Sequence, residues 1–324
     1  MMDRRDFVGG AVALGAGAML AGEAVAQASV PIIDTHIHLF DSRRPQGAAW
    51  SGGRGFGAPM ALPATYRAIA QPLGIVGAIK VEASAWMEDN LWVLETIQPD
   101  PFMVGTIGNL RPEQAEFAEY LGRYRKNPLF LGIRQGTNWG YEIAKQADNP
   151  AFIDGLRLLA KADLTFESAN PRIDLFQAIV KISDRVPELR IVLDHIPLFH
   201  PTPENEKEYG ALLKEFAGRK QIYCKLSQII HRERRPDGTQ GAMQDTLAPH
   251  KEWLDRLMGI FGEDRVIFGS DWPSSVFNDT LPTVVSVAKE YFAGRSRAAQ
   301  EKYFWRNSVA AYKWKPRMAG QPRL

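Results

Sequence analysis

Ile33-Asp34-Thr35-His36-Ile37-His38-Leu39-Phe40 is the stretch that decides how the chain folds and where its chemistry lies. It alternates β-branched apolar residues with polar ones, as a β-strand does when successive side chains point to opposite faces. Asp34, His36 and His38 are therefore expected on one face. The Cα atoms of the two histidines would lie about 7 Å apart, so both imidazoles can converge on one ion. A hydrogen-bonded histidine pair without metal is the alternative.

Seven further short apolar runs follow this one, and amphipathic segments separate them. The eight predicted strands are 32–38, 76–82, 103–107, 130–134, 164–167, 190–195, 222–227 and 266–271. The segments between them include 112–125, 151–162, 173–186, 203–217 and 250–262, with apolar residues at three- and four-residue spacing. This alternation predicts an α/β fold, a single (β/α)8 TIM barrel. A doubly wound open sheet is the alternative, but it would normally have fewer strands and a glycine-rich first turn.

The length is compatible with a single α/β barrel domain, and the composition is ordinary for a soluble globular protein. The 324 residues are 45% hydrophobic and 23% charged, with a formal net charge of +2. No dense Lys/Arg run indicates a nucleic-acid surface. Cys224 is the only cysteine, so an intramolecular disulfide is excluded. We expect a barrel domain at 29–312, long loops at 41–62 and 228–249 after strands one and seven, and a polar C-terminal tail at 313–324.

Residues 1–28 are predicted to be a signal peptide rather than part of the fold. The segment 3–8 resembles a twin-arginine export motif, with Arg4-Arg5 followed by a polar and two apolar residues. A Gly/Ala-rich run follows, and Ala26-Gln27-Ala28 supplies a small-x-small cleavage pattern. Glu23 closes the apolar run below the roughly 20 residues that a membrane span needs. We therefore expect a periplasmic or secreted protein without a stable membrane anchor.

Two further polar residues close predicted strands and complete the candidate site. His195 ends the sixth strand, in Leu193-Asp194-His195-Ile196-Pro197. Asp271 ends the eighth, in Gly269-Ser270-Asp271-Trp272-Pro273, where a carboxylate can ligate a metal or take a proton from water. An N-cap or a loop-ordering aspartate is the alternative for Asp271. Because all barrel strands end at the same rim, these side chains and the histidine pair are expected to meet.

The combination resembles the amidohydrolase superfamily, and within it the amidohydrolase-related branch (amidohydrolase 2) of TIM-barrel metal-dependent hydrolases. The matching segments are 34–41, 193–196 and 269–273, in order across nearly the whole mature chain. The resemblance implies that the strand-one histidines and Asp271 hold or surround the reaction centre, and that the aspartate activates water. The branch includes lactonases for sugar acids and for aromatic-breakdown intermediates, and its relatives include non-oxidative decarboxylases.

Two departures from the family pattern limit the metal chemistry. Many members carry a strand-four lysine that bridges two metals once carboxylated, whereas strand four here ends in Arg134-Gln135. Strand five usually brings another histidine, but here Glu167 is its only candidate ligand. A binuclear centre is therefore not expected. The ligand set for one divalent metal, expected to be Zn²⁺, comprises His36, His38, His195 and Asp271, with Glu167 able to replace one of them. A metal-free mechanism is the alternative.

We expect a hydrolase that opens a lactone of a sugar acid or of an aromatic-derived acid. Asp271 would deprotonate water, and His195 with Arg134 or the metal would stabilise the oxyanion. A non-oxidative decarboxylase and a non-catalytic periplasmic binding protein are the alternatives. The expected partner is a small-molecule substrate, and the sequence does not indicate an oligomeric state. The substrate-binding residues expected on the same rim are Glu82, Arg134, Glu167, Lys225 and Trp272. For the lysines, an ion pair of Lys80 or Lys225 with Glu82 that only fills the barrel is the alternative.

Overall fold

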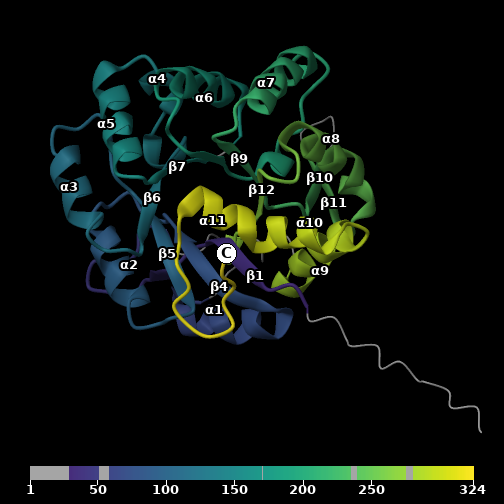
Figure 1. Ribbon diagram of the computed structural model, residues 1–324, viewed down its shortest axis with the longest axis horizontal. Coiled ribbons are helices and arrows are strands. Elements are labelled where there is room, and N and C mark those ends of the chain that lie inside the picture. Colours follow the sequence, from purple (N-terminus) through teal and green to yellow (C-terminus); the bar gives the residue numbers. More distant parts are fainter. Residues whose placement is uncertain (1–28, 51–57, 170, 235–238, 275–279) are drawn as a thin grey trace, which may run out of the picture.

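The computed structural model describes residues 29–50, 58–169, 171–234, 239–274 and 280–324. Eight parallel strands follow one another in the order β1-β4-β5-β6-β7-β8-β9-β12, with helices around them (Figure 1). The last strand returns to the first, since Asp271 N donates to His36 O at 2.8 Å and His38 N to Trp272 O at 2.7 Å. The predicted TIM barrel and its eight strands are confirmed.

The observed strands differ from the predicted ones by at most three residues at an end. They are β1 (Ile32–Ile37), β4 (Ile75–Val81), β5 (Met103–Gly108), β6 (Phe130–Gln135), β7 (Thr165–Ser168), β8 (Ile191–Leu193), β9 (Ile222–Leu226) and β12 (Val266–Phe268). The last residues of several predicted strands belong to the rim loops. His195 and Asp271 are among them, so both candidate residues lie just beyond the sheet.

The helices cover the outside of the barrel with one apolar face each. α6 buries Leu175, Phe176, Ile179 and Ile182, which recur at helical spacing. The helices around the barrel are α1 (Pro63–Ala70), α2 (Asp89–Ile97), α3 (Phe117–Tyr124), α4 (Ile143–Gln146), α5 (Pro150–Lys161), α6 (Ile173–Arg185), α7 (Glu206–Gly218), α8 (Lys251–Phe261) and α9 (Leu281–Ala293). None of the described helices is long and apolar enough to cross a membrane.

The interior of the barrel is a separate apolar cluster that is closed from one end. Ile33, Val104, Val192 and Ile267 from the strands pack with Trp305, Tyr312 and Trp314. Beyond α9 the chain forms α10 (Arg297–Glu301), the π-helical turn Lys302–Arg306 and α11 (Asn307–Tyr312). Trp305 lies in the π-helical turn and Tyr312 ends α11, and Trp314 follows two residues later. Figure 1 shows α10 and α11 lying across the barrel. Because the strands are parallel, this plug at their N-terminal ends leaves the C-terminal rim for the site.

The segment expected to be a polar tail has no helix or strand but is held against the barrel. The Arg317 guanidinium donates to the backbone oxygens of Ile97, Asp100 and Met103 at 2.7–3.1 Å. The amide nitrogen of Gln321 donates to Val76 O at 3.1 Å. Both side chains satisfy carbonyl groups beside the first residues of neighbouring strands, so this segment completes the lower end of the barrel.

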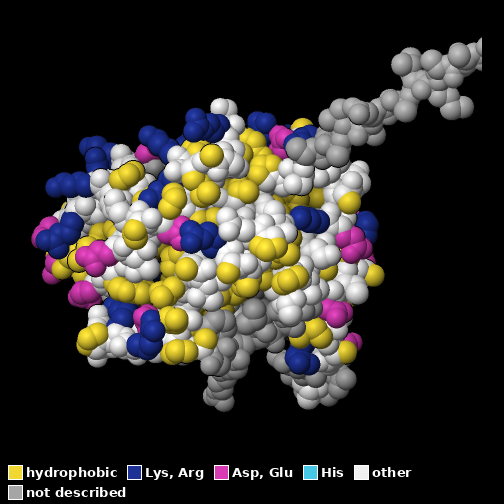
Figure 2. All heavy atoms as spheres, turned by 90° about the horizontal axis from the view of Figure 1, so that it is seen from below, with side chains coloured by type: hydrophobic (Ala, Val, Ile, Leu, Met, Phe, Trp, Pro, Cys, Tyr) yellow, Lys and Arg dark blue, Asp and Glu magenta, His cyan; other side chains and the backbone are white. Residues whose placement is uncertain are grey.

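Two small hairpins elaborate the loops that the sequence predicts after strands one and seven. β2 (Phe40–Asp41) pairs with β3 (Met60–Ala61), and β10 (His231–Arg234) pairs with β11 (Gln240–Gln244). On the face drawn in Figure 2, Lys and Arg side chains are interspersed with Asp and Glu, as the small net charge suggests.

The predicted facing of Asp34 was wrong. Its Oδ2 accepts a hydrogen bond from the Tyr66 hydroxyl in α1 at 2.5 Å, and its Oδ1 accepts from Ser270 N at 2.9 Å. It thus points toward a covering helix, while its neighbour Ile33 packs inside the barrel. The register between β1 and β4 shifts between Asp34 and Ile37, so strict alternation fails within the motif.

Candidate active site

Four predicted side chains converge at the C-terminal rim of the barrel. Nε2 of His36 lies 3.3 Å from Nε2 of His38, and each lies close to Oδ1 of Asp271, at 3.3 and 3.0 Å. Nε2 of His195 lies 3.7 Å from the same oxygen. The side chains come from the ends of β1, β8 and β12, and all four are at least 95% buried. The structure therefore brings the predicted ligand set together.

The spacing of these atoms fits a divalent metal ion. Four ligands at about 2.0–2.1 Å from a tetrahedral ion lie about 3.4 Å from one another. Nδ1 of His38 lies 3.0 Å from Val81 O, which can only accept, so this nitrogen donates. In the neutral ring, the lone pair of Nε2 then faces the Asp271 carboxylate. Such a pair repels unless a cation or a proton lies between the two atoms. Within the described residues, His36, His38 and Asp271 form one candidate metal group, and His36, Asp194 and His195 form another.

The charges of the site follow from burial and mutual contact. Burial raises the pKa of Asp271, but the attraction of His195 and the contacts with His38 and His36 outweigh it, so the pKa lies below its ordinary value. Burial, followed by the charge of Lys225, holds the pKa of His36 well below its ordinary value. Burial also lowers the pKa of His195. At neutral pH the site therefore holds an ionised aspartate beside two neutral imidazoles.

A cavity of about 340 Å³ opens above these groups. This volume is within the range of small-molecule sites. It is lined by His38, Trp50, Glu82, Ala83, Arg134, Asn138, Trp139, His195, Leu198, Gln228, Asp271 and Ser274. Asp271 lines it although this residue is only 2% exposed, and Gln228 donates a hydrogen bond to Oδ2 of this aspartate.

Comparison with known proteins identifies this arrangement. The Amidohydrolase family model matches residues 33–314. The chain belongs to the amidohydrolase family. It is 24% identical over 288 residues to L-fucono-1,5-lactonase from Burkholderia multivorans, covering 86% of this chain and 94% of that one. This amidohydrolase is therefore an enzyme of a hydrolase family.

Solved structures share the fold of this amidohydrolase. An amidohydrolase from Burkholderia multivorans with bound zinc has a TM-score of 0.73 and 20% identity, covering 88% of this chain and 100% of the other. A probable 2-pyrone-4,6-dicarboxylic acid hydrolase from Acinetobacter baumannii, with citric acid bound, has a TM-score of 0.67 and 18% identity. That comparison covers 87% of this chain and 99% of the other.

Several residues that line the cavity of the amidohydrolase have backbone torsion angles that are rare for residues other than glycine. Among the described non-glycine residues with positive φ, four line the cavity: Trp139, His195, Gln228 and Asp271, at 51–61°. L-residues in this left-handed region each cost about 1–3 kcal/mol. The surrounding structure holds four of them in one place, as is common where side chains must be aimed at a ligand.

Arg134 lies in the cavity but is already paired. Its Nε donates to Oε2 of Glu82 at 2.7 Å, and its Nη2 donates to Glu82 O at 2.7 Å. Nη1 lies 3.5 Å from Oδ2 of Asp194. The indole N–H of Trp139 donates to the other carboxylate oxygen of Glu82. Glu82, Arg134 and Trp139 therefore form one side of the cavity, in which the arginine charge is neutralised by its neighbour.

The structure places three predicted substrate-binding residues outside the cavity. Lys225 and Glu167 are fully buried below it, and their Nζ and Oε1 atoms lie 2.9 Å apart. Both were expected on the rim as substrate contacts, but they pair with each other, and Lys225 does not pair with Glu82. Trp272 is 2% exposed and packs against Tyr66, with ring centroids 5.1 Å apart. None of the three reaches the space that a substrate would occupy.

Several cavity residues had no strong signal in the sequence. Trp50 lies in the long loop after strand one, and its ring centroid is 5.0 Å from that of His38. Asn138, Leu198, Gln228 and Ser274 also lie in rim segments. Their position in loops after barrel strands was the only available indication, and it applies equally to many other loop residues.

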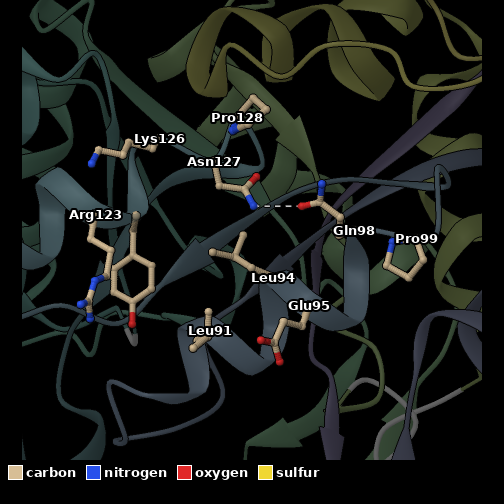
Figure 3. Close-up of a pocket in the computed structure, with 10 residues that line it drawn as sticks. Leu91, Leu94, Glu95, Gln98, Pro99, Arg123, Lys126, Asn127 and Pro128 are labelled. Carbon is tan, nitrogen blue, oxygen red and sulfur yellow. Dashed lines mark hydrogen bonds between the residues drawn. The ribbon is translucent and has the colours of Figure 1, made fainter.

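A larger groove of about 760 Å³ lies elsewhere, between α2 and the segment that follows α3 (Figure 3). It is lined by Leu91, Leu94, Arg123, Lys126 and Asn127, among others, and Asn127 donates to Gln98 Oε1 at 3.0 Å. No histidine lines it. Its residues come from the outer helical layer rather than from the strand ends, so it is not part of the candidate active site.

Proposed function

We propose that this amidohydrolase opens the lactone ring of a sugar acid, with Asp271 activating the attacking water. The observation that carries the proposal is an ionised carboxylate that lines a cavity of about 340 Å³ and lies against three imidazoles. A water held on Asp271 can give its proton to the carboxylate while it attacks the ester carbonyl. The same carboxyl group can then protonate the leaving oxygen.

We also propose that one Zn²⁺ ion binds within the cluster of His36, His38, His195 and Asp271. A bound zinc ion would polarise the carbonyl and lower the pKa of water. The residues of the chain perform the remaining tasks. His195 is positioned by a 2.8 Å contact from Nδ1 to Ser227 Oγ, so its Nε2 stays directed at the reaction centre. In histidines that ligate a metal, the other ring nitrogen typically makes a hydrogen bond of this kind.

The charge of the cavity favours a neutral sugar lactone over a dicarboxylate. Among its described lining residues, the only Arg or Lys is Arg134, and Glu82 neutralises it. Asp271 adds a negative charge. A substrate with two carboxylates would therefore meet no unpaired Arg or Lys here, and the proposed metal ion could offset only one of them, so burying the other would be costly. Sugar hydroxyls, in contrast, can exchange hydrogen bonds with Asn138, Gln228 and Ser274.

Two tryptophans provide the apolar contacts that a sugar ring needs. Trp139 is 39% exposed although its indole N–H is bonded, so a ring face remains available. Trp50 is half-buried beside His38 in the same cavity. The flat faces of both side chains can contact the C–H groups of a lactone ring.

Decarboxylation and ligand binding without catalysis are the competing functions. Glu167 occupies the strand on which the related decarboxylases usually carry a histidine ligand, and it is buried in an ion pair with Lys225. This weighs against decarboxylation. The deciding experiment is a pH-indicator assay with L-fucono-1,5-lactone, other aldonolactones and 2-pyrone-4,6-dicarboxylate. We expect acid release from aldonolactones only. Carbon dioxide release from aromatic acids, or calorimetric binding without turnover, would replace the proposal with one of its competitors.

We also propose that the enzyme is exported through the twin-arginine route. The proposal rests on Arg4-Arg5 and the small-x-small pattern at 26–28, which lie outside the described residues. Cell fractionation should find the wild type in the periplasm and the Arg4→Lys/Arg5→Lys variant in the cytoplasm. Equal distribution of the two proteins would contradict this route.

A further inference from the structure

A second, smaller cavity, the side cavity, lies next to the cavity that contains Asp271, the main cavity. The side cavity has a volume of about 20 Å³, which is room for about one water-sized group. Four residues line both cavities: Glu82, Arg134, Asn138 and Trp139. The two cavities therefore share a wall, and a small polar space lies directly beside the site of the proposed reaction.

The side cavity contains a hydrogen-bond acceptor that lacks a donor. Gln135, the last residue of β6, lines this cavity and is only 5% exposed. Its Nε2 donates to Leu110 O, and this contact fixes the orientation of the amide. Its Oε1 is buried, and no described residue donates a hydrogen bond to it. A buried carbonyl oxygen without a donor is unfavourable, so a bound group that donates to it would be stabilised there.

The side cavity also contains donors that lack an acceptor. Arg111 lines it from the loop that follows β5, and its guanidinium carbon lies 4.7 Å from the ring centroid of Tyr141. Within the part of the chain that the structure describes, the guanidinium N–H groups have no hydrogen-bonded or ion-paired partner. Stacking on the tyrosine uses the face of the guanidinium, so the N–H groups along its edge remain available to a ligand.

A hydroxyl is the group that satisfies both side chains. It can donate its proton to Oε1 of Gln135 and accept a hydrogen bond from Arg111 with a lone pair. A methyl group would leave both side chains unsatisfied, and a carboxylate could accept from Arg111 but could not donate to Gln135. A carboxylate also has two oxygen atoms, whereas the side cavity has room for about one water-sized group. The size and the polarity of the side cavity therefore favour the same ligand group.

We propose that the side cavity is a subsite for a hydroxyl on the exocyclic carbon of the lactone, which donates to Gln135 and accepts from Arg111. This inference rests on the proposed function, because it places the lactone ring in the main cavity. The exocyclic carbon passes the shared wall at Trp139, whose side chain is 39% exposed and moves to admit it. The enzyme then prefers lactones with a hydroxymethyl group over 6-deoxy lactones, which carry a methyl group at this position.

Pairs of lactones that differ in one hydroxyl test the subsite. L-galactono-1,5-lactone and L-fucono-1,5-lactone differ only at C6, as do D-glucono-1,5-lactone and its 6-deoxy analogue. The lactones are freshly prepared, and the rates are corrected for spontaneous hydrolysis. For the pair that the wild type opens, we expect kcat/KM to be at least about tenfold higher with the hydroxylated lactone. Equal values, or a preference for the 6-deoxy lactone or for an analogue with a carboxylate at C6, would overturn the subsite alone. If the wild type opens no lactone, the proposed function fails and this inference fails with it.

Two variants assign the discrimination to the two side chains. Arg111→Met and Gln135→Leu should each bring the two kcat/KM values within about threefold of each other, through a loss with the hydroxylated lactone only. Arg123→Met, in the outer groove, is the matched control and should keep the wild-type ratio. An unchanged ratio in a folded variant, or an equal loss with both lactones, would overturn the assignment. If Gln135→Leu does not fold because Leu110 O loses its donor, Arg111→Met at the partly exposed rim still decides.

Discussion

Nε2 of His38 lies 3.0 Å from Oδ1 of Asp271, and the other nitrogen of the same ring donates to Val81. Two lone pairs at this distance repel each other, so the contact is stable only with a positive charge between them. A metal ion and a proton are the two candidates. They differ in what happens when a chelator is applied.

Chelation is predicted to remove activity together with metal. Dialysis against a chelator should lower both the zinc content and kcat to a few per cent, because the carbonyl would lose its polarising ion. One equivalent of Zn²⁺ should restore both. The measurements are elemental analysis and the lactone assay on the same samples. Full activity at less than one zinc per ten chains would show that the proton, rather than the metal, fills the contact.

Replacement of Asp271 by asparagine should lower kcat at least about 10³-fold, because proton transfer to a placed base contributes about 10²–10⁴-fold. The shape of the side chain is retained, so circular dichroism and the unfolding midpoint should change little. Asp154→Asn, on the outer surface, is the matched control and should keep wild-type rates. A fully active Asp271→Asn variant would rule out the assigned base.

Trp139 is predicted to contribute substrate affinity rather than chemistry. Trp139→Ala should raise KM for the lactone about tenfold, equivalent to about 1.4 kcal/mol, with a smaller change in kcat. Trp86→Ala is a matched control, since Trp86 is 38% exposed and lies outside the cavity. Steady-state kinetics of both variants decide the matter. Equal KM values for Trp139→Ala and the wild type would remove this residue from the substrate contacts.

Lys80 makes stability depend on pH. Burial lowers its pKa to about 8, against the attraction of Glu82 and Asp89. In the unfolded chain its pKa is about 10.4, so between these values the unfolded state binds more protons and stability rises with pH. Lys80→Met should therefore raise the free energy of unfolding at pH 7 by about 1–3 kcal/mol, and the gain should shrink toward pH 10.

Urea unfolding of wild type and Lys80→Met at pH 7 and pH 9.5 measures this difference. Lys126→Met, at an exposed position, should leave the free energy of unfolding nearly unchanged at both values. A Lys80→Met protein less stable than the wild type at pH 7 would show that the lysine charge is fully compensated in the barrel.

The fold was predictable because eight apolar runs separated by amphipathic segments leave few other architectures. The convergence of His36, His195 and Asp271 was predictable for the same reason, since residues at the ends of barrel strands share one rim. How deep each residue lies below that rim was not predictable from the sequence. Lys225 and Glu167 were expected on the rim, but both are fully buried and neither lines the cavity, and only the packed barrel shows how deep the cavity reaches.

Other features depend on three-dimensional context that no local pattern contains. The shift within β1 turns Asp34 toward Tyr66, and an alternating sequence does not show where the extra residue is inserted. Trp50 and Gln228 lie in loops whose paths are set by tertiary contacts. The neutralisation of Arg134 by Glu82 likewise required the relative positions of two strands 52 residues apart in sequence.

Arg317 and Gln321 bond to carbonyl groups near the beginning of the second and third barrel strands. These contacts join residues that lie 214 and 245 positions apart in the chain. Pairing across such separations closes long loops, which costs entropy and slows folding. We therefore expect this end of the barrel to close among the later events when the denatured protein refolds.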